Sequence, residues 1–199
     1  MLFRSGVRLL KKETVLFSRD EHPNRKSTPE ILAKLKPAFK KDGTVTAGNA
    51  SGLNDGASVA LLASEEAVAK YNLKPMAEIV AVGQGGVDPS IMGMGPVPAI
   101  ADVLKRAGLK LTDIELFELN EAFASQSLGV IKQLCEDHGV TKEWILERAN
   151  VNGGAIALGH PIGASGNRIV TTLVHEMRRR QVTYGLRSEE RRVGKECRS

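Results

Sequence analysis

The stretch from Val151 to Gly166 constrains the fold more than any other part of the chain. It places one histidine, His160, among five glycines and one proline, directly before a run of apolar residues with helical spacing. Glycines let the backbone turn sharply and approach a ligand closely. The pattern predicts a strand that turns through a glycine-rich loop into a helix, with His160 at the helix start. There the helix dipole disfavours the imidazolium form, so we expect a neutral imidazole.

Segments with strand and helix character alternate along the chain, and glycines or prolines separate them. Strands are expected at 57–63, at 76–82, at 114–119 and from residue 151 onward. Helices are expected at 30–35, 64–71, 97–106, 123–139, 144–148 and 165–180. Such an alternation is typical of an α/β layered domain.

Composition narrows the class of protein without identifying it. The 199 residues are 42% hydrophobic, which is enough to form a core. No apolar run reaches the roughly 18–20 residues of a membrane helix, and the first ten residues do not resemble a secretory signal. The net charge of +5 gathers at the two ends without interleaved aromatics, which disfavours nucleic-acid binding. The two cysteines form no disulfide framework or metal motif, and we expect a cytoplasmic protein.

Two polar residues stand where strands are expected to end. Asn120 follows the strand at 114–119, and His160 follows the strand that begins at Val151. The carboxyl ends of strands in an α/β sheet share one crevice, so the two side chains are expected to meet there. A histidine and a water held by an asparagine can together stabilise the negative oxygen of an enolate or a thioester.

Each of these residues also has a purely structural interpretation. Asn120 can serve as a helix cap, and a lone histidine such as His160 can simply pack in its turn. Cys135 lies on the apolar face of its predicted helix and is expected in the core. The other three histidines stand in polar stretches and are expected at the surface: His22, His138 and His175.

Three motifs, taken in order, favour the functional interpretation. They are Asn49-Ala50-Ser51-Gly52-Leu53-Asn54-Asp55-Gly56, Asn120-Glu121-Ala122-Phe123-Ala124, and Asn152-Gly153-Gly154 with Gly159-His160-Pro161-Ile162-Gly163-Ala164-Ser165-Gly166. Together they resemble the thiolase family over roughly residues 13–186. The related ketoacyl synthases use two histidines, whereas Asn120 favours thiolases.

This resemblance implies a fold and a reaction. The expected fold is α/β, a thiolase-like layered α/β/α arrangement that is incomplete. It comprises the C-terminal domain without its last strands, together with the last strand of the N-terminal domain. Thiolases are acyltransferases that carry out reversible Claisen condensation and thiolysis of acetyl-CoA and 3-ketoacyl-CoA through a cysteine acyl-enzyme. The resemblance implies no separate cofactor, because coenzyme A thioesters are the substrates. Full-length members form homodimers or homotetramers, and no nucleic-acid or membrane partner is expected.

The same resemblance assigns roles to individual residues. His160 resembles the histidine that activates the first cysteine and donates to the thioester oxygen. Asn120 resembles the residue that positions a water in the oxyanion hole. Ser51 is expected to contact the pantetheine arm. Three further residues are expected to line the acyl and pantetheine pocket: Met92, Ala122 and Phe123.

The chain also departs from the family pattern. We expect a loop-domain remnant at 1–43, the last strand and helix of the N-terminal domain at 44–72, a truncated C-terminal domain at 73–186 and a non-family polar tail at 187–199. The strands at 57–63 and 76–82 are then expected to lack partners. Both catalytic cysteines are missing, and Cys197 has no glycine-rich setting. The chain alone is therefore expected to be inactive, and the alternative is a non-catalytic CoA-binding or subunit-interaction fragment.

Overall fold

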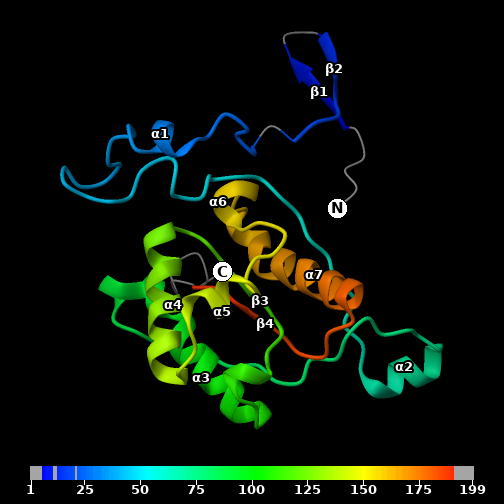
Figure 1. The fold of residues 1–199 in the computed structure, drawn as a ribbon. Helices are drawn as coiled ribbons and strands as arrows, with labels where there is room; N and C mark the ends of the chain where they lie inside the picture. Colours follow the sequence, from blue (N-terminus) through cyan, green and yellow to red (C-terminus); the bar gives the residue numbers. More distant parts are fainter. Residues whose placement is uncertain (1–5, 11–12, 21, 191–199) are drawn as a thin grey trace.

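The computed structural model describes residues 6–10, 13–20 and 22–190 of the chain. At its centre, strands β3 (Leu116–Leu119) and β4 (Gly185–Ser188) pair in parallel, with Phe117 opposite Leu186. Helix α7 (Ile162–Arg180) covers one side of the pair, and α3 (Pro96–Ala107) and α4 (Ala124–His138) lie on the other (Figure 1). This α/β/α layering confirms the predicted fold class.

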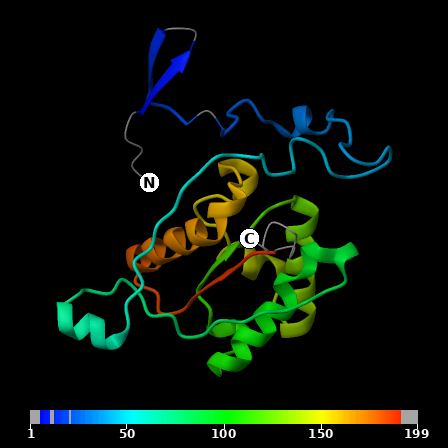
Figure 2. The same cartoon turned by 180° about the vertical axis from the view of Figure 1, so that it is seen from behind.

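The remaining elements are short. The strands β1 (Gly6–Leu10) and β2 (Glu13–Phe17) form an antiparallel hairpin that the sequence analysis did not predict. The short helices are α1 (Pro29–Leu32), α2 (Glu65–Tyr71), α5 (Lys142–Leu146) and α6 (Ala155–Leu158), with 3-10 turns η1 (Pro89–Met94) and η2 (Leu111–Asp113). The hairpin stands apart from the layered unit, and the cyan segment after α1 passes over α6 and runs along α7 (Figures 1 and 2).

Most helices lie close to the predicted ranges, but the helix expected at 30–35 is α1, which ends at Leu32. Thr28 and Ser64 cap α1 and α2 with their side-chain oxygens, which accept from the backbone N–H three residues later. Gly108 and Gly139 end α3 and α4 in the left-handed conformation that glycine adopts without strain. Helix α7 begins at Ile162, three residues before the predicted start. The expected helix at 144–148 is α5, and it begins earlier, after Thr141.

The core lies wholly within the layered unit. Its buried hydrophobic residues all fall between Ile100 and Leu186, and they join α3, β3, α4, α5 and β4. Phe117 of β3 contacts Trp144 edge-to-face, with ring centroids 6.0 Å apart. Cys135 lies half-buried against this core, as predicted.

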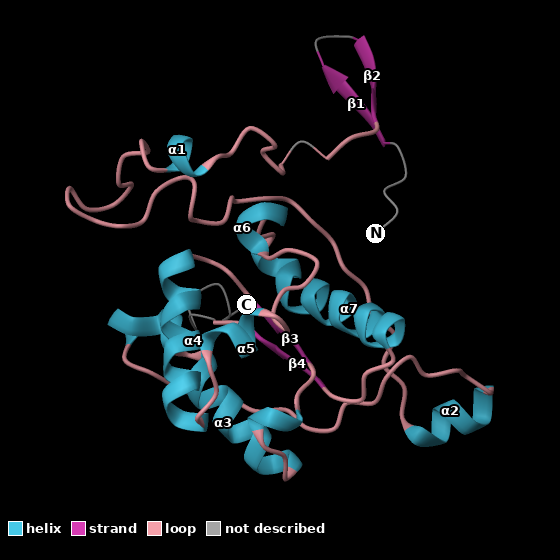
Figure 3. Ribbon diagram, viewed as in Figure 1, coloured by secondary structure: helices cyan, strands magenta, loops and turns pink. Residues whose placement is uncertain are grey.

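Three predicted strands are wrong. Residues 57–63 and 76–82 are extended but pair with no strand in the described part of the chain, and their apolar side chains are largely exposed (Figure 3). A strand needs a partner to satisfy its backbone, and these segments find none. The strand expected from Val151 is reduced to one parallel bridge between Ala149 and Phe117, because Asn150 turns the chain at a φ of 50°.

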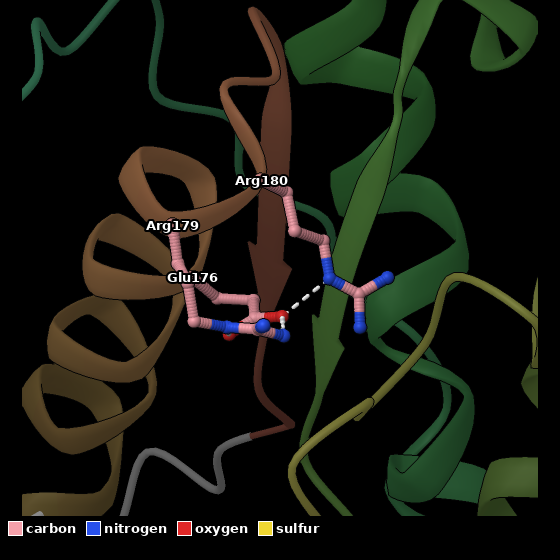
Figure 4. Close-up of polar contacts among 3 residues, drawn as sticks. All are labelled: Glu176, Arg179 and Arg180. Carbon is pink, nitrogen blue, oxygen red and sulfur yellow. Dashed lines mark hydrogen bonds and ion pairs between the residues drawn. The ribbon is translucent and has the colours of Figure 1, made fainter.

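The last turn of α7 is fixed by a buried carboxylate. Arg179 donates to Glu176 from Nε at 2.8 Å and from its terminal nitrogen at 2.5 Å, and Arg180 also pairs with Glu176 (Figure 4). The Arg179 hydrogen bonds are the largest cause that lowers the pKa of Glu176, to about 2. Arginines are favourable at a helix C-terminus, and here two of them also share a specific acceptor.

Candidate functional site

The segment 49–54 joins two of the three motifs through its backbone. Ser51 N–H donates to the Ala122 carbonyl at 2.9 Å, and Ala124 N–H donates to the Asn49 carbonyl at 2.9 Å. Ala50 and Phe123 form an antiparallel bridge between these bonds. Ser51, Ala122 and Phe123, which were predicted to contact one substrate, therefore lie together at the start of α4.

The same segment then reaches the histidine loop. His160 N–H donates to the Gly52 carbonyl and to Asn54 Oδ1, both at 3.2 Å. Gly159 has a φ of 95°, and a Cβ there would lie 2.7 Å from the Asn54 carboxamide. A glycine is required at this position for both its conformation and its close approach. We call residues 49–54 the strap, because they bind the Asn120 motif at one end and the His160 motif at the other.

The Glu121 side chain connects the motif at 120–124 to the glycine pair of the third motif. Its Oε1 accepts from Asn150 Nδ2 at 2.8 Å, and its Oε2 accepts from the Ile156 N–H at 3.4 Å. A Cβ at Gly154 would lie 2.0 Å from the Glu121 carboxyl carbon. The glycine pair of Asn152-Gly153-Gly154 thus leaves space for a carboxylate that belongs to the motif at 120–124.

Hydrogen bonds define the tautomer of His160. Its Nδ1 lies 2.6 Å from the hydroxyl of Ser165, which is fully buried. The Ser165 hydroxyl also lies 3.1 Å from the Pro161 carbonyl, and its single hydrogen satisfies both contacts together only when Nδ1–H of the histidine donates to Ser165. In that tautomer Nε2 is the unprotonated nitrogen, which is able to take a proton. Burial, and then the charge of Arg168, lower the pKa of His160, which agrees with the expected neutral ring through causes other than the helix dipole.

Asn120 lies directly after β3 and is 3% exposed. Its N–H donates to the Ser188 carbonyl at 3.0 Å, which continues the pairing of β3 with β4. Its Nδ2 donates to Glu190 Oε1 at 3.0 Å. Its Oδ1 is buried and has no hydrogen-bond partner among the described residues.

Family models and relatives agree on one family. The model described as "Thiolase, C-terminal domain" matches residues 73–194, and "Thiolase, N-terminal domain" matches residues 6–66. The chain belongs to the thiolase family. It is 53% identical over 178 residues to an acetyl-CoA acetyltransferase of Syntrophomonas wolfei, and this alignment covers 88% of the chain and 43% of the relative. It is 56% identical to the mitochondrial 3-ketoacyl-CoA thiolase of Homo sapiens over 85% of the chain and 41% of that protein.

Solved thiolase structures share this fold. The Bacillus anthracis acetyl-CoA acetyltransferase superposes with a TM-score of 0.82 at 49% identity, covering 92% of this chain and 44% of that one. The human mitochondrial 3-ketoacyl-CoA thiolase in complex with CoA superposes with a TM-score of 0.73 at 48% identity, covering 91% and 43%. The chain therefore spans less than half the length of the thiolases it matches.

Some of the predicted site residues lie together in this fold, and others do not. Ser51, Ala122 and Phe123 meet at the strap, and His160 contacts its other end. Met92 lies in η1, which packs against α4, and among the described residues no hydrogen bond joins it to the strap. No hydrogen bond links the His160 ring to Asn120 among the described residues, so their convergence on one ligand stays a prediction.

Sequence reasoning missed several residues of this candidate site. His22 was expected at the surface, but it is half-buried, and its Nδ1 accepts from Asn54 Nδ2 at 3.2 Å. His22 and Asn54 are 32 positions apart, and no local sequence pattern predicts a contact at that separation. Ser165 and Glu121 did lie inside the quoted motifs. Glu190 belongs to the expected polar tail, yet it is buried against Asn120.

Another carboxyl is buried on β3. Glu118 of β3 is buried, and its Oε1 has no hydrogen-bond partner among the described residues. Burial raises the pKa of Glu118 to about 7, although the nearby charge of Arg168 lowers it. Arg168 thus acts on both Glu118 and His160, from one side of α7. The described part of the chain holds no grouping of three metal-ligating side chains, and none of its helices has the length and hydropathy for a membrane crossing.

Proposed function

We propose that this chain supplies the histidine and asparagine half of a thiolase active site, which acts on acetyl-CoA and 3-ketoacyl-CoA through a cysteine acyl-enzyme. The strap carries this proposal. It holds Ser51 beside Ala122 and Phe123, and it holds the backbone of His160, by hydrogen bonds of 2.9 to 3.2 Å. The relatives of this chain include acetyl-CoA acetyltransferases and 3-ketoacyl-CoA thiolases.

The tautomer of His160 gives the ring a specific task. With Nδ1–H committed to Ser165, Nε2 accepts the proton of a thiol, and a thiolate forms. The resulting imidazolium then donates Nε2–H to the thioester oxygen as negative charge develops there. The lowered pKa of His160 keeps the ring neutral and ready to accept at pH 7.

Asn120 is suited to a complementary task. Its Oδ1 is buried, lies at the end of β3 and lacks a partner among the described residues. A water that donates one hydrogen to this oxygen can donate its other hydrogen to the thioester oxygen. Ser51, Met92, Ala122 and Phe123 are proposed to contact the pantetheine arm and the acyl group.

We further propose that this chain binds CoA thioesters without turning them over alone. Cys135 is the one cysteine among the described residues, it lies on α4 against the core, and burial raises the pKa of its thiol. A protonated, half-buried thiol is a poor nucleophile. This observation favours the alternative of a non-catalytic CoA-binding fragment for the chain by itself.

Two assays test these proposals together. Incubation with acetoacetyl-CoA and CoA should leave the enolate absorbance unchanged, and calorimetric titration with acetyl-CoA should show saturable binding. His160→Ala should weaken that binding about tenfold, the value of one good hydrogen bond, while His175→Ala on the exposed face of α7 should not. Turnover would overturn the proposed inactivity, and absence of binding would overturn the proposed site.

A further inference from the structure

One edge of β3 is paired first by a backbone segment and then by a side chain. Strand β4 lies along one edge of β3, and residues 148–150 lie along the other. On that second edge the Phe117 N–H donates to the Arg148 carbonyl at 3.0 Å, and the Phe117 carbonyl accepts from the Asn150 N–H at 2.9 Å. In a parallel ladder, the next pair of bonds would join Leu119 to the backbone that follows.

That backbone turns away from β3, and the Asn150 side chain takes its place. Asn150 has a φ of 50°, and its carbonyl accepts from the Gly153 N–H at 2.8 Å. Its Oδ1 accepts from the Leu119 N–H at 2.9 Å, and its Nδ2 donates to the Leu119 carbonyl at 2.8 Å. A backbone N–H only donates and a carbonyl only accepts, so these two contacts fix which end of the carboxamide is oxygen.

The second hydrogen of Asn150 Nδ2 reaches past Asn120 to the next residue. Nδ2 also donates to Glu121 Oε1 at 2.8 Å, and Glu121 Oε2 accepts from the Ile156 N–H at 3.4 Å. Asn150 therefore holds the residue before Asn120 by its backbone and the residue after it by its side chain. Through Glu121 the same contacts extend to helix α6, which precedes the histidine loop.

We infer that Asn150 is a positioning residue, whose carboxamide holds the chain on both sides of Asn120 and thereby orients the Asn120 side chain. This inference rests on the proposed function, in which Asn120 Oδ1 holds a water beside the thioester oxygen. Asparagine meets every requirement of position 150. It adopts a positive φ more readily than most residues with a Cβ, it accepts through one atom, and it donates twice through another. Glycine supplies only the conformation, and an ionised aspartate cannot donate.

Amide hydrogen exchange of the full chain separates this role from general stability. Asn150→Gly keeps the backbone conformation but removes the carboxamide, so the Leu119 N–H should exchange about tenfold faster, the effect of one lost hydrogen bond. The Phe117 N–H, which is bonded to the Arg148 backbone, is the internal reference and should change by less than about twofold. Equal acceleration of both amides, or no change at Leu119, would overturn the inference.

The orientation of Asn120 is read from its side-chain amide signal. The signal is assigned in nitrogen-15 spectra as the one missing from Asn120→Ala, and it should shift in Asn150→Gly. Asn72→Gly is the matched control, because Asn72 is an exposed asparagine with nearly the same φ, 49°, outside the site. That control should leave the Asn120 signal and the Leu119 exchange rate unchanged. An Asn120 signal that stays in place in Asn150→Gly would contradict the inference.

An exchange of donor and acceptor tests the contact between Asn150 and Glu121. Asn150→Asp places two carboxylates opposite each other, and Glu121→Gln leaves one oxygen for two donors. In the double variant, the new amide nitrogen at position 121 can donate to the new carboxylate at position 150, so the pair re-forms in the reverse direction. The double variant should bind acetyl-CoA about fivefold more tightly than Asn150→Asp, with the Asn120 signal nearer its original position. A double variant no better than Asn150→Asp would contradict the inference.

Acetyl-CoA binding by the unmodified chain distinguishes this inference from the proposed function. If Leu119 exchange and the Asn120 signal respond to Asn150→Gly but acetyl-CoA does not bind, the positioning contact stands and the proposed function fails. If acetyl-CoA binds but Asn150→Gly leaves the Asn120 signal unchanged, the proposed function stands and the role of Asn150 fails.

Discussion

The layered unit from η1 to β4 and the extended part before it carry comparable numbers of apolar side chains but use them differently. In the layered unit, residues such as Leu134 and Ile145 are fully buried in one core. In the extended part, Val59, Leu61 and Ile79 are mostly exposed, and no residue from 18 to 82 whose burial is described is buried. The strap is the place where the extended part adheres to the layered unit through backbone hydrogen bonds.

This contrast separates the part of the chain that stabilises the fold from the part that positions the candidate site. The free energy of folding comes from the layered unit, because apolar burial is the dominant favourable contribution. The candidate site instead lies along the boundary between the two parts. Its geometry depends on a few hydrogen bonds between the strap and the loops at 122–124 and 159–160.

A matched pair of leucine substitutions tests the difference in burial. Leu134→Ala should lower the free energy of unfolding by about 2–5 kcal/mol, because it opens a cavity in a closed core. Leu61→Ala, at 84% exposure, should change it by less than about 0.5 kcal/mol. Urea unfolding followed by circular dichroism measures both. Equal losses would show that the extended part packs in solution.

A matched pair of glycine substitutions tests the fit between motifs. Gly154→Ala should lower the free energy of unfolding by about 1–3 kcal/mol, because the new Cβ overlaps the Glu121 carboxyl group. Gly86→Ala in the extended part meets no atom within 4 Å and should be close to neutral. The same unfolding experiment applies. A neutral Gly154→Ala would mean that Glu121 does not lie against the glycine pair.

The charged end of α7 gives the layered unit a specific acid sensitivity. The folded-state pKa of Glu176 is lowered to about 2, so its contribution is complete above the ordinary value of 4.5 and is lost as pH falls toward 2. Glu176→Gln should lower the free energy of unfolding by about 1–2 kcal/mol at pH 7 and by less at pH 3. The effect is modest because Arg179 is largely exposed.

An exposed pair on α4 serves as the control for this acid effect. Glu136 lies 3.8 Å from Lys132, and both side chains are exposed. Glu136→Gln should therefore change stability by well under about 1 kcal/mol at either pH. Equal pH dependence in the two variants would contradict a special role for Glu176.

The smallest expected effect concerns the tautomer of His160. Nitrogen-15 spectra above the lowered pKa of His160 should show the neutral ring with its proton on Nδ1. Ser165→Ala removes the acceptor and should shift the tautomer balance by an energy of about 1 kcal/mol. The exposed His175 should not change. A ring that carries its proton on Nε2 in the unmodified chain would contradict the assigned hydrogen bonds.

Sequence reasoning succeeded where local chemistry decides the structure. The helix ends at Gly108 and Gly139 and the caps at Thr28 and Ser64 all follow from single residues. It failed where structure needs a partner at a distance. Residues 57–63 have strand composition but no strand beside them, and the pairing expected near Val151 is interrupted by the turn at Asn150.

In the candidate site as well, residues inside the motifs could be named from the sequence, whereas contacts between distant residues could not. The resemblance implied that Ser51, Ala122 and Phe123 contact the substrate, which stays a prediction, and the structure places their backbones side by side. No pattern in the sequence predicted that His22 would accept from Asn54 or that Glu190 would accept from Asn120. Those contacts join residues 32 and 70 positions apart, and only the folded backbone brings them into reach.

The most direct test of the account is an amide chemical-shift map of the full chain titrated with acetyl-CoA. The account predicts that the strap, residues 120–123 and His160 shift together along one saturation curve, while the exposed segment at 57–63 does not shift. Shifts confined to residues outside these three motifs, or no saturable shifts at all, would contradict it.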